Sequence, residues 1–354
     1  MRNHKTNYAF YRLPNDLIFT KIECKNPRIL SSLDSLKVGS DVGYLISPFI
    51  ITAETPCVFL EAENADSLPI PPDLESKKTV KRYCTLMSEK ADELVYHEMF
   101  VKAKFFLGKP LCKKIVLART FSINFDYDQN VLEAMFFRAC KAYPRCFISL
   151  FSTEMTGTWL IATPELLLAN KHGKWQTMAL AGTISREEQL QKNANAWKNK
   201  NKSEQEYVTH YICEKLSPVS ENLVKIGPYP SPAANLFHLR TDITFETSNG
   251  KNDLTKILSL LHPTPAVCGI PSRLAQQAIL EIENVPRRYY SGFSGPFGIA
   301  DQHQFFVSLR CMNIKEDNNC LLYAGGGLLP ASDETEELEE TNRKLRTILN
   351  LIEN

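Results

Sequence analysis

The first 80 residues combine short apolar runs with turn residues. Apolar runs at residues 42–51 and 57–60 are separated by the segment Thr-Ala-Glu-Thr-Pro, a pattern typical of strands rather than of helices. Pro69, Pro71 and Pro72 then lead into the charged segment 75–82, which predicts a linker. We expect the linker to end at a helix over residues 83–106.

Farther along the chain, strand-like and helix-like stretches follow one another without a fixed order. Strand-like runs lie at residues 114–125, 146–151, 159–168, 305–314 and 320–324. Helical patterns lie at residues 131–142, 187–216 with an Asn/Lys-rich middle, 254–261, 272–283 and 333–352. The later chain is therefore expected to be the more helical part. Because the order is not a regular βαβ alternation, it predicts an α+β fold with large, mostly antiparallel sheets flanked by helices.

We expect one fold rather than separate units. Residues 1–80 are predicted to be a β-rich segment integrated into the same fold as the larger domain, residues 81–354. No internal repeat divides the sequence.

Composition narrows the function to the handling of a small polar ligand. The 354 residues are 44% hydrophobic, enough for a large core, and 41 basic against 40 acidic residues leave a net charge of +1. No overall field therefore draws the protein to nucleic acid or to an anionic membrane. The longest apolar run, 42–51, is shorter than the roughly 20 residues of a membrane span, and residues 1–20 lack the apolar core of a signal peptide. We expect a cytoplasmic protein with no membrane or nucleic-acid partner.

The ten cysteines are scattered along the chain, and no pair has CxxC spacing. Such spacing lets two thiolates share one zinc ion. The cysteines are therefore predicted to be reduced, buried thiols.

The last predicted helix carries Glu337, Glu340 and Lys344 at i, i+3 and i+7, so the three side chains share one face. One interpretation is a solvated acidic helix with a salt bridge. The other is a site for a divalent cation, because Mg²⁺ prefers oxygen ligands and shares them with an anionic substrate. The spacing alone leaves both open.

Two loop-like segments could position a site. Gly325, Gly326 and Gly327 end an apolar run before the last helix, and they predict either a tight strand-to-helix turn or bare backbone amides that contact an anion. His262 opens a rigid segment rich in Pro. A lone histidine with no metal-ligand pattern is more often structural than catalytic.

Two charged residues stand at the heads of apolar runs. Lys113 and Lys114 precede such a run, and strand alternation sends their ammonium groups to opposite faces, so one is expected to point inward. Glu165 opens another such run. A carboxyl group buried there has its pKa raised and can act as a general acid at neutral pH.

Several blocks of sequence in one order resemble the chorismate-utilising enzymes, which include isochorismate synthase, salicylate synthase, anthranilate synthase component I and aminodeoxychorismate synthase. The resemblance covers about residues 110–354. Its blocks are Lys114-Ile-Val-Leu-Ala-Arg, Thr163-Pro-Glu-Leu-Leu-Leu, Leu180-Ala-Gly-Thr, Leu261-His-Pro-Thr-Pro-Ala-Val-Cys-Gly-Ile-Pro, Tyr289-Tyr-Ser-Gly, Ser308-Leu-Arg, Tyr323-Ala-Gly-Gly-Gly and Glu339-Glu-Thr-Asn-Arg-Lys-Leu.

The resemblance implies a Mg²⁺-dependent reaction in which water adds at C2 of chorismate and the C4 hydroxyl leaves. Lys114 is similar to the family base that deprotonates the water, and Glu165 to the acid that protonates the leaving hydroxyl. Glu204 and Glu340 resemble direct Mg²⁺ ligands, with Glu337 at the ion's water shell. Positions similar to those that bind or surround the substrate are Gly182, Thr183, His238, Ala266, Tyr290, Arg310, Gly325, Gly327 and Lys344. The chain departs from the family at Gln205, where histidine is usual, and at Asn201, where relatives have an acidic residue.

Three positions select among the reactions of the family. Relatives that use ammonia usually have glutamine in place of Lys114, so lysine favours water as nucleophile and no glutaminase subunit is expected. Ala181 replaces a lysine typical of aminodeoxychorismate synthases. Ala266 stands where relatives that eliminate pyruvate tend to have threonine. The resemblance thus favours an isochorismate synthase that works as a monomer, with a salicylate synthase or a non-catalytic chorismate-binding protein as alternatives. Its product is expected to feed menaquinone synthesis, with siderophore synthesis as the other destination.

Overall fold

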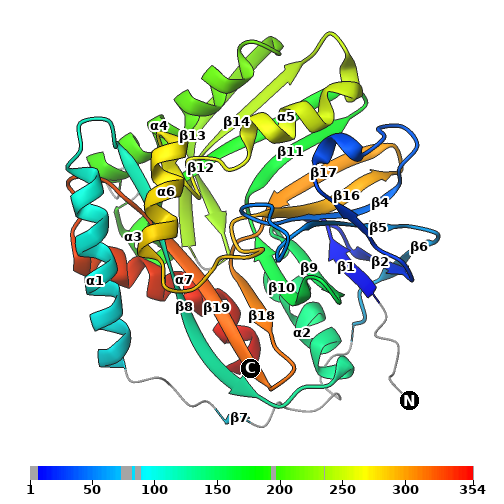
Figure 1. The fold of residues 1–354 in the computed structure, drawn as a ribbon, viewed down its shortest axis with the longest axis horizontal. Helices are drawn as coiled ribbons and strands as arrows, with labels where there is room; N and C mark the ends of the chain where they lie inside the picture. Colours follow the sequence, from blue (N-terminus) through cyan, green and yellow to red (C-terminus); the bar gives the residue numbers. More distant parts are fainter. Residues whose placement is uncertain (1–6, 73–81, 84–88, 193–196, 235, 354) are drawn as a thin grey trace.

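A computed structural model describes residues 7–72, 82–83, 89–192, 197–234 and 236–353 of the chain. Two large sheets form its centre (Figure 1), and every strand pairing among the described residues is antiparallel. This confirms the predicted α+β class with antiparallel sheets.

Ten strands make up the first sheet. In spatial order they are β15 (Gly269–Ile270), β8 (Lys114–Phe125), β19 (Asn319–Leu328), β18 (Cys311–Ile314), β10 (Gly157–Thr163), β9 (Phe147–Thr153), β1 (Asn7–Arg12), β2 (Ile18–Cys24) and β6 (Ala65–Pro69), with β7 (Arg82–Tyr83) also paired to β8. The second sheet runs β13 (Glu221–Ala233), β14 (Leu236–Glu246), β12 (Lys174–Ser185), β11 (Leu166–Lys171), β17 (Gln302–Val307), β16 (Phe293–Ile299), β4 (Gly43–Ser47), β5 (Cys57–Glu61) and β3 (Arg28–Leu30). The first 70 residues thus supply strands to both sheets. The division at residue 80 falls among residues outside the described part, and it stays a prediction.

The two sheets pack face to face over a shared apolar layer. Phe147 of the first sheet stacks on Phe306 of the second, with ring centroids 4.2 Å apart. The buried hydroxyl of Tyr44 in β4 crosses the layer, since it lies 2.6 Å from the Ser149 hydroxyl in β9 and 3.0 Å from that of Ser294 in β16. Buried apolar area of this kind is the main stabilising contribution to the fold.

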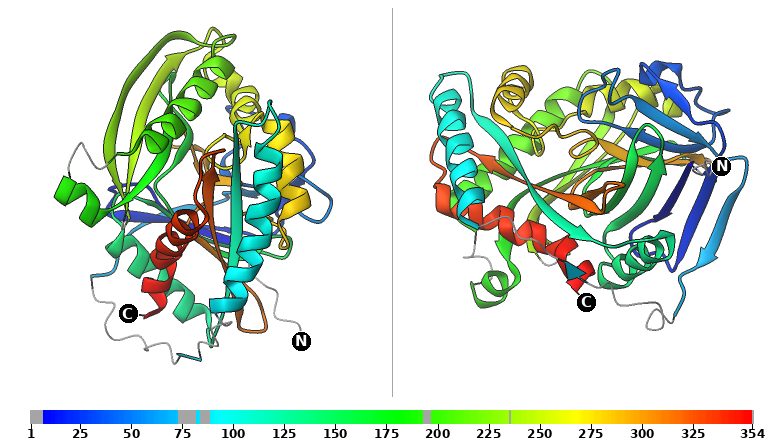
Figure 2. Two further views of the ribbon diagram at one scale, coloured as in Figure 1. Left: turned by 90° about the vertical axis from the view of Figure 1, so that its left-hand side faces the viewer. Right: turned by 60° about the horizontal axis from the view of Figure 1, so that its bottom comes forward.

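Helices cover the outer faces of the sheets (Figure 2). The helices α2 (Gln129–Ala142) and α7 (Glu334–Glu353) pack on the first sheet, and α1 (Glu89–Leu107) and α6 (Ser272–Ile282) pack on its β8 edge. The helices α4 (Asn199–Leu216) and α5 (Leu254–Leu261) cover the second sheet, and α3 (Arg186–Lys192) follows β12. None of the helices in the described residues combines the length and apolar character that crossing a membrane requires.

Two predicted strands are each two strands in different sheets. The run 159–168 is β10 of the first sheet followed by β11 of the second, and the run 305–314 is β17 of the second followed by β18 of the first. The expectation of single strands was wrong because all four strands are buried, so the apolar run continues while the pairing partner changes. Pro164 lies at the first crossing, and Arg310, with a φ of 48°, lies at the second.

The expectation of a mainly helical later chain was also wrong, since β12, β13, β14 and β16 were missed. Strand β13 is the edge of its sheet and is mostly exposed. Its three prolines at 228, 230 and 232 lack the amide hydrogen of a paired strand. A sequence with this composition does not show the apolar alternation of a half-buried strand.

The helix boundaries follow the predictions with two changes. Helix α1 begins at Glu89 rather than at residue 83, which belongs to β7. The predicted helix 187–216 is divided into α3 and α4, as its Asn/Lys-rich middle suggested. Most of the predicted linker lies outside the described residues.

Candidate active site

A cavity lies between the two sheets, close to both crossings. The crossing from β10 to β11 supplies Glu165, and that from β17 to β18 supplies Arg310. Most predicted site residues line this cavity together: Glu165, Gly182, Thr183, Glu204, His238, Ala266, Tyr290, Arg310, Gly325, Gly327 and Lys344. Lys114 and Glu340 are outside its lining but pair with the lining residues Glu204 and Lys344. Glu337 pairs with Lys200, and both are outside the lining.

Lys114 is the inward-facing lysine that strand alternation predicted. Its side chain is fully buried, whereas Lys113 is exposed. The Lys114 Nζ lies 2.9 Å from Oε1 of Glu204 on α4. The other oxygen of Glu204 accepts a bond of 3.3 Å from the amide of Gly182. The predicted base and a predicted metal ligand are therefore an ion pair in this structure.

Gln205 anchors the helix that carries Glu204. The Gln205 side-chain amide donates to the carbonyl of Ala179 in β12 at 3.0 Å and to the hydroxyl of Thr241 in β14 at 3.1 Å. The family histidine expected at this position is thus replaced by a residue that ties α4 to the sheet. Asn201 donates to the Thr183 carbonyl, 3.4 Å away, so it too contacts the sheet.

Glu165 is suited to hold a proton at neutral pH. Burial raises the pKa of its carboxyl group to about 7, although Lys114, Lys344 and Arg310 act in the opposite direction. The carbonyl of Glu165 accepts from the amide of Val307, 3.0 Å away, which fixes the backbone at the crossing. A carboxyl group with this pKa can donate a proton to a leaving group.

Arg310 is a buried cation held by neutral groups. Its Nη2 donates to Nε2 of His238 at 2.9 Å, and its Nη1 donates to the hydroxyl of Thr347 at 3.1 Å. Burial lowers the pKa of His238 to about 3, and Arg310 and Lys344 act in the same direction. His238 is therefore neutral, and its Nδ1 donates to the Gly182 carbonyl at 3.0 Å. Within the described residues no carboxylate forms an ion pair with Arg310, which leaves this guanidinium suited to an anion from outside.

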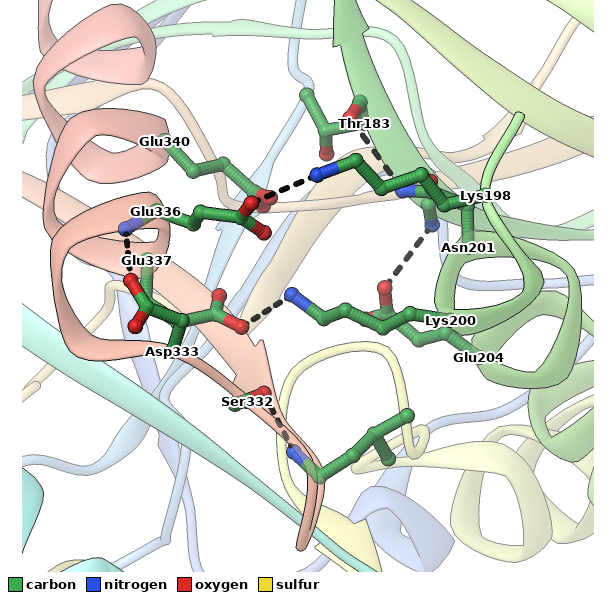
Figure 3. Close-up of polar contacts among 12 residues, drawn as sticks. Thr183, Lys198, Lys200, Asn201, Glu204, Ser332, Asp333, Glu336, Glu337 and Glu340 are labelled. Carbon is green, nitrogen blue, oxygen red and sulfur yellow. Dashed lines mark hydrogen bonds and ion pairs between the residues drawn. The ribbon is translucent and has the colours of Figure 1, made fainter. Parts of the chain in front are cut away.

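Lysines pair with the acidic residues of α7 (Figure 3). Lys200 of α4 forms an ion pair with Glu337. Lys344 lies 2.7 Å from Glu340 on the same helix. Burial and then the neighbouring Glu340 raise the pKa of Glu337 to about 7. Burial acts the same way on Glu340, but Lys344 and Lys200 outweigh it and lower the pKa to about 2. The spacing of Glu337, Glu340 and Lys344 was compatible with a salt-bridged helix or with a cation site. The structure contains the salt bridge between Glu340 and Lys344.

The three glycines of β19 provide space for the site. They lie within a strand paired to β8 rather than in a turn, so the predicted turn was wrong. A Cβ at Gly327 would lie 2.1 Å from Oε1 of Glu204, and one at Gly326 would lie 3.3 Å from Oε2 of Glu337. The carboxylates of α4 and α7 therefore approach neighbouring positions of the same strand.

These residues fit a hard divalent cation such as Mg²⁺. The donors are carboxylate oxygens, and the buried Oε2 of Glu337 lacks a hydrogen-bond partner among the described residues. No three acidic, histidine or cysteine side chains of the described residues are close enough to form a complete ligand cluster as they stand. Mg²⁺ commonly uses only one or two carboxylates and completes its shell with water and substrate. Glu204, Glu337 and Glu340 are the residues that would hold it.

Two contacts of the site were not predicted. Thr347 on α7 orients Arg310, and Lys200 pairs with Glu337. Lys200 belongs to the Asn/Lys-rich stretch, where no pattern distinguishes one lysine from its neighbours. Only the pairing of α4 with α7 identifies it.

His262 and the described cysteines are structural, as predicted. Nε2 of His262 lies 3.1 Å from the Pro48 carbonyl and 3.2 Å from that of Phe49, and burial lowers its pKa to about 4. The nine cysteines within the described residues are free thiols, and all but Cys213 are buried.

The fold and the buried charges define a chorismate-utilising enzyme. The chain belongs to the chorismate binding enzyme family, whose profile matches residues 55–353. Isochorismate synthase EntC of Escherichia coli strain K12 is 31% identical over 268 residues, which cover 73% of this chain and 67% of that protein. The putative isochorismate synthase MenF of Mycobacterium tuberculosis is 33% identical over 249 residues, 67% of this chain and 66% of that protein.

Solved structures share the fold over nearly the whole chain. The putative 2,3-dihydroxybenzoate-specific isochorismate synthase DhbC from Bacillus anthracis has a TM-score of 0.80 at 21% identity, covering 99% of this chain and 97% of that one. Anthranilate synthase component I from Streptococcus pneumoniae has a TM-score of 0.69 at 14% identity, covering 98% and 93%. The family resemblance and the fold inferred from the sequence are confirmed.

Proposed function

We propose that the protein is an isochorismate synthase that converts chorismate to isochorismate in a Mg²⁺-dependent reaction. The observation that supports this most is the buried carboxyl group of Glu165 in the lining of the cavity, together with the buried Lys114, which pairs with the lining residue Glu204 and acts electrostatically on Glu165. The relatives named isochorismate synthase support the same activity.

The reaction requires one group that accepts a proton and one that donates a proton. Lys114 must enter this step as a neutral amine rather than as the cation of its ion pair with Glu204. It then takes a proton from water as the water oxygen forms its bond to C2 of the ring. The ring double bond shifts, the C4–O bond breaks, and Glu165 protonates the departing hydroxide to water. One water enters and one leaves, so substrate and product are isomers.

Cationic groups hold the substrate's two carboxylates. Arg310 offers a planar pair of donors to one of them, with His238 and Thr347 fixing its orientation. Lys344 stands nearby, bonded to Glu340 and to the carbonyl of Gly325. A bound Mg²⁺ would supply positive charge for a ring carboxylate, held by the acidic residues of α4 and α7.

The product test separates the candidate functions. The protein is incubated with chorismate and Mg²⁺ at neutral pH, and the products are separated by chromatography. Isochorismate alone is expected. Salicylate with pyruvate would indicate a salicylate synthase, and binding of chorismate without turnover would indicate a non-catalytic protein.

Lys114→Met tests the water-activating role. The variant keeps most of the length of the side chain but cannot accept a proton, so we expect turnover to fall by at least about a hundredfold. Lys113→Met is the matched control, because Lys113 is the neighbouring lysine on the exposed face. Circular dichroism checks that both variants are folded. Turnover of Lys114→Met close to that of the wild type would contradict the role.

The remaining assignments follow the relatives. We propose that the protein acts in the cytoplasm as a single chain without a glutaminase subunit, and that its product feeds menaquinone or siderophore synthesis. One solved structure with this fold is named a menaquinone-specific isochorismate synthase, and another a putative 2,3-dihydroxybenzoate-specific isochorismate synthase. Size-exclusion chromatography with light scattering tests the monomer.

A further inference from the structure

Lys200 lies at the place where a cation would face the acidic residues of both helices. It extends from α4 toward α7 and forms an ion pair with Glu337 (Figure 3). The Glu337 side chain has no exposed surface, and that of Lys200 is 21% exposed. A lysine at the mouth of a buried acidic site is positioned to act as its counter-ion.

The electrostatic neighbours of Lys200 are the three predicted metal-binding carboxylates. Burial disfavours its charged form, yet Glu337, and then Glu340 and Glu204, together raise the pKa of Lys200 above its ordinary value. The ammonium therefore interacts with all three carboxylates from a single position. A divalent cation bound by the same oxygens would lie close to it.

The ion pair between Lys200 and Glu337 leaves part of the Glu337 carboxylate without a partner, which a purely structural ion pair would not require. Lys200 contacts only Oε1 of Glu337, while the buried Oε2 has no partner within hydrogen-bond distance among the described residues, although the Ser332 side chain is near enough to lower the pKa of Glu337. Each of the other two carboxylates has a lysine of its own, Lys344 for Glu340 and Lys114 for Glu204. Leaving a buried carboxylate oxygen without a partner is costly, and a cation would remove that cost.

We propose that Lys200 is an internal counter-ion that holds the carboxylate site neutral in the metal-free enzyme and must be displaced when a divalent cation binds. The inference rests on the proposed function, because it takes Glu204, Glu337 and Glu340 as the cation site. The Lys200 ammonium and a divalent cation held by the same carboxylates would repel each other strongly, because the site is partly buried. Lys200 therefore lowers the affinity for the cation and keeps the empty site stable.

Lys198 provides a matched control two residues away. It forms an ion pair of 2.6 Å with Glu336, again between α4 and α7, but both side chains are largely exposed, at 66% and 54%. Figure 3 shows the two lysines reaching toward α7 from neighbouring positions. Lys198→Met removes the same charge from the same segment without touching the buried carboxylates.

Calorimetric titration of Mg²⁺ into substrate-free protein at fixed ionic strength tests the inference. We expect Lys200→Met to bind Mg²⁺ about tenfold or more tightly than the wild type, because one unit of competing charge is gone. Lys198→Met should stay within about twofold of the wild type, since exposed pairs are screened. Lys200→Arg, which keeps the charge, should bind as weakly as the wild type.

Thermal unfolding distinguishes a counter-ion role of Lys200 from a purely structural ion pair between α4 and α7. Lys200→Met should unfold at a lower temperature than the wild type in a chelator and should recover at saturating Mg²⁺. If Lys200 has only a structural role, Lys200→Met should lower the unfolding temperature equally in the chelator and at saturating Mg²⁺. If Lys200→Met does not fold, Lys200→Gln replaces it in both measurements.

Two results would overturn the inference: a Mg²⁺ affinity of Lys200→Met equal to or weaker than that of the wild type, or an equal loss of stability with and without Mg²⁺. Failure of the proposed function gives a different result. A wild-type protein that binds Mg²⁺ but makes no isochorismate would overturn the function, and the titrations of the Lys200 variants would still decide the role of Lys200.

Discussion

Glu165 is a buried carboxyl group near three cations, yet none of the described residues forms an ion pair with it. Burial raises its pKa from 4.5 to about 7. The folded protein therefore keeps this proton between pH 4.5 and 7, whereas the unfolded chain has already lost it. The stability that the proton contributes is complete below pH 4.5 and is lost as the pH rises through 7. The carboxyl group that we propose as a general acid thus has a cost in stability at neutral pH.

Glu165→Gln should reveal this cost. Glutamine does not titrate, so the difference in unfolding free energy between the variant and the wild type should shift in the variant's favour by about 3 kcal/mol from pH 4.5 to pH 8. Urea unfolding at both pH values measures it, with the exposed Glu221→Gln as control. A difference that does not change with pH would show that the carboxyl group is not buried as described.

At the scale of elements, β19 and α4 determine where the acidic residues lie. Strand β19 pairs with β8 so that Gly327 stands opposite Val116, beside the buried Lys114. The missing side chain leaves room for the ion pair of Lys114 with Glu204. Gly326 and Gly327 are therefore favoured by the carboxylates of α7 and α4 that approach this strand, whereas a Cβ at Gly325 would lie 2.7 Å from the Tyr290 hydroxyl.

Gly327→Ala should disrupt the site while sparing the fold. Its Cβ would be 2.1 Å from Oε1 of Glu204 and 2.8 Å from Cε of Lys114. Both atoms belong to side chains that can move, so the strand is preserved while the ion pair is displaced. We expect a loss of turnover of at least about tenfold, with an unchanged circular dichroism spectrum. Gly108→Ala, whose Cβ would make only ordinary contacts, is the control, and full activity of Gly327→Ala would refute this role of the glycine.

The sequence allowed some of these elements to be predicted better than others. Helix α5 and strand β8 have the bounds that their apolar patterns predicted, because each places a continuous apolar face against the core. The crossings at Pro164 and Arg310 were missed because a change of sheet leaves the apolar pattern intact. Lys200 could not be found from sequence, since its contact with α7 depends on tertiary packing alone. Pattern and spacing indicated Lys114, Glu165 and the helix face at residues 337–344, whereas the remaining site residues came from resemblance to a family. The roles of all of them stay predictions.

At the scale of the whole molecule, buried titratable groups in different parts of the fold together determine how the stability of the protein depends on pH. Burial lowers the pKa of His238 to about 3 and those of His262 and His303 to about 4. Below pH 6.5 the three histidines of the unfolded chain gain protons, whereas those of the folded chain do not. These histidines therefore make the protein less stable as the pH is lowered. Glu165 and Glu337, with pKa values of about 7, act in the opposite direction because the folded chain takes up their protons first.

Among these five groups, three histidines against two glutamates leave a difference of about one proton between their unfolded and folded states near pH 5 to 6. One proton corresponds to a fall in unfolding free energy of about 1.4 kcal/mol per pH unit on acidification. His262→Gln can keep a donor toward the carbonyls of Pro48 and Phe49 but does not titrate, so it should make the profile nearly flat over this window. Urea unfolding in a metal chelator between pH 5 and 6 measures both slopes. Parallel slopes for the wild type and His262→Gln would mean that His262 is not held neutral by the fold, and the balance of three against two would then be wrong.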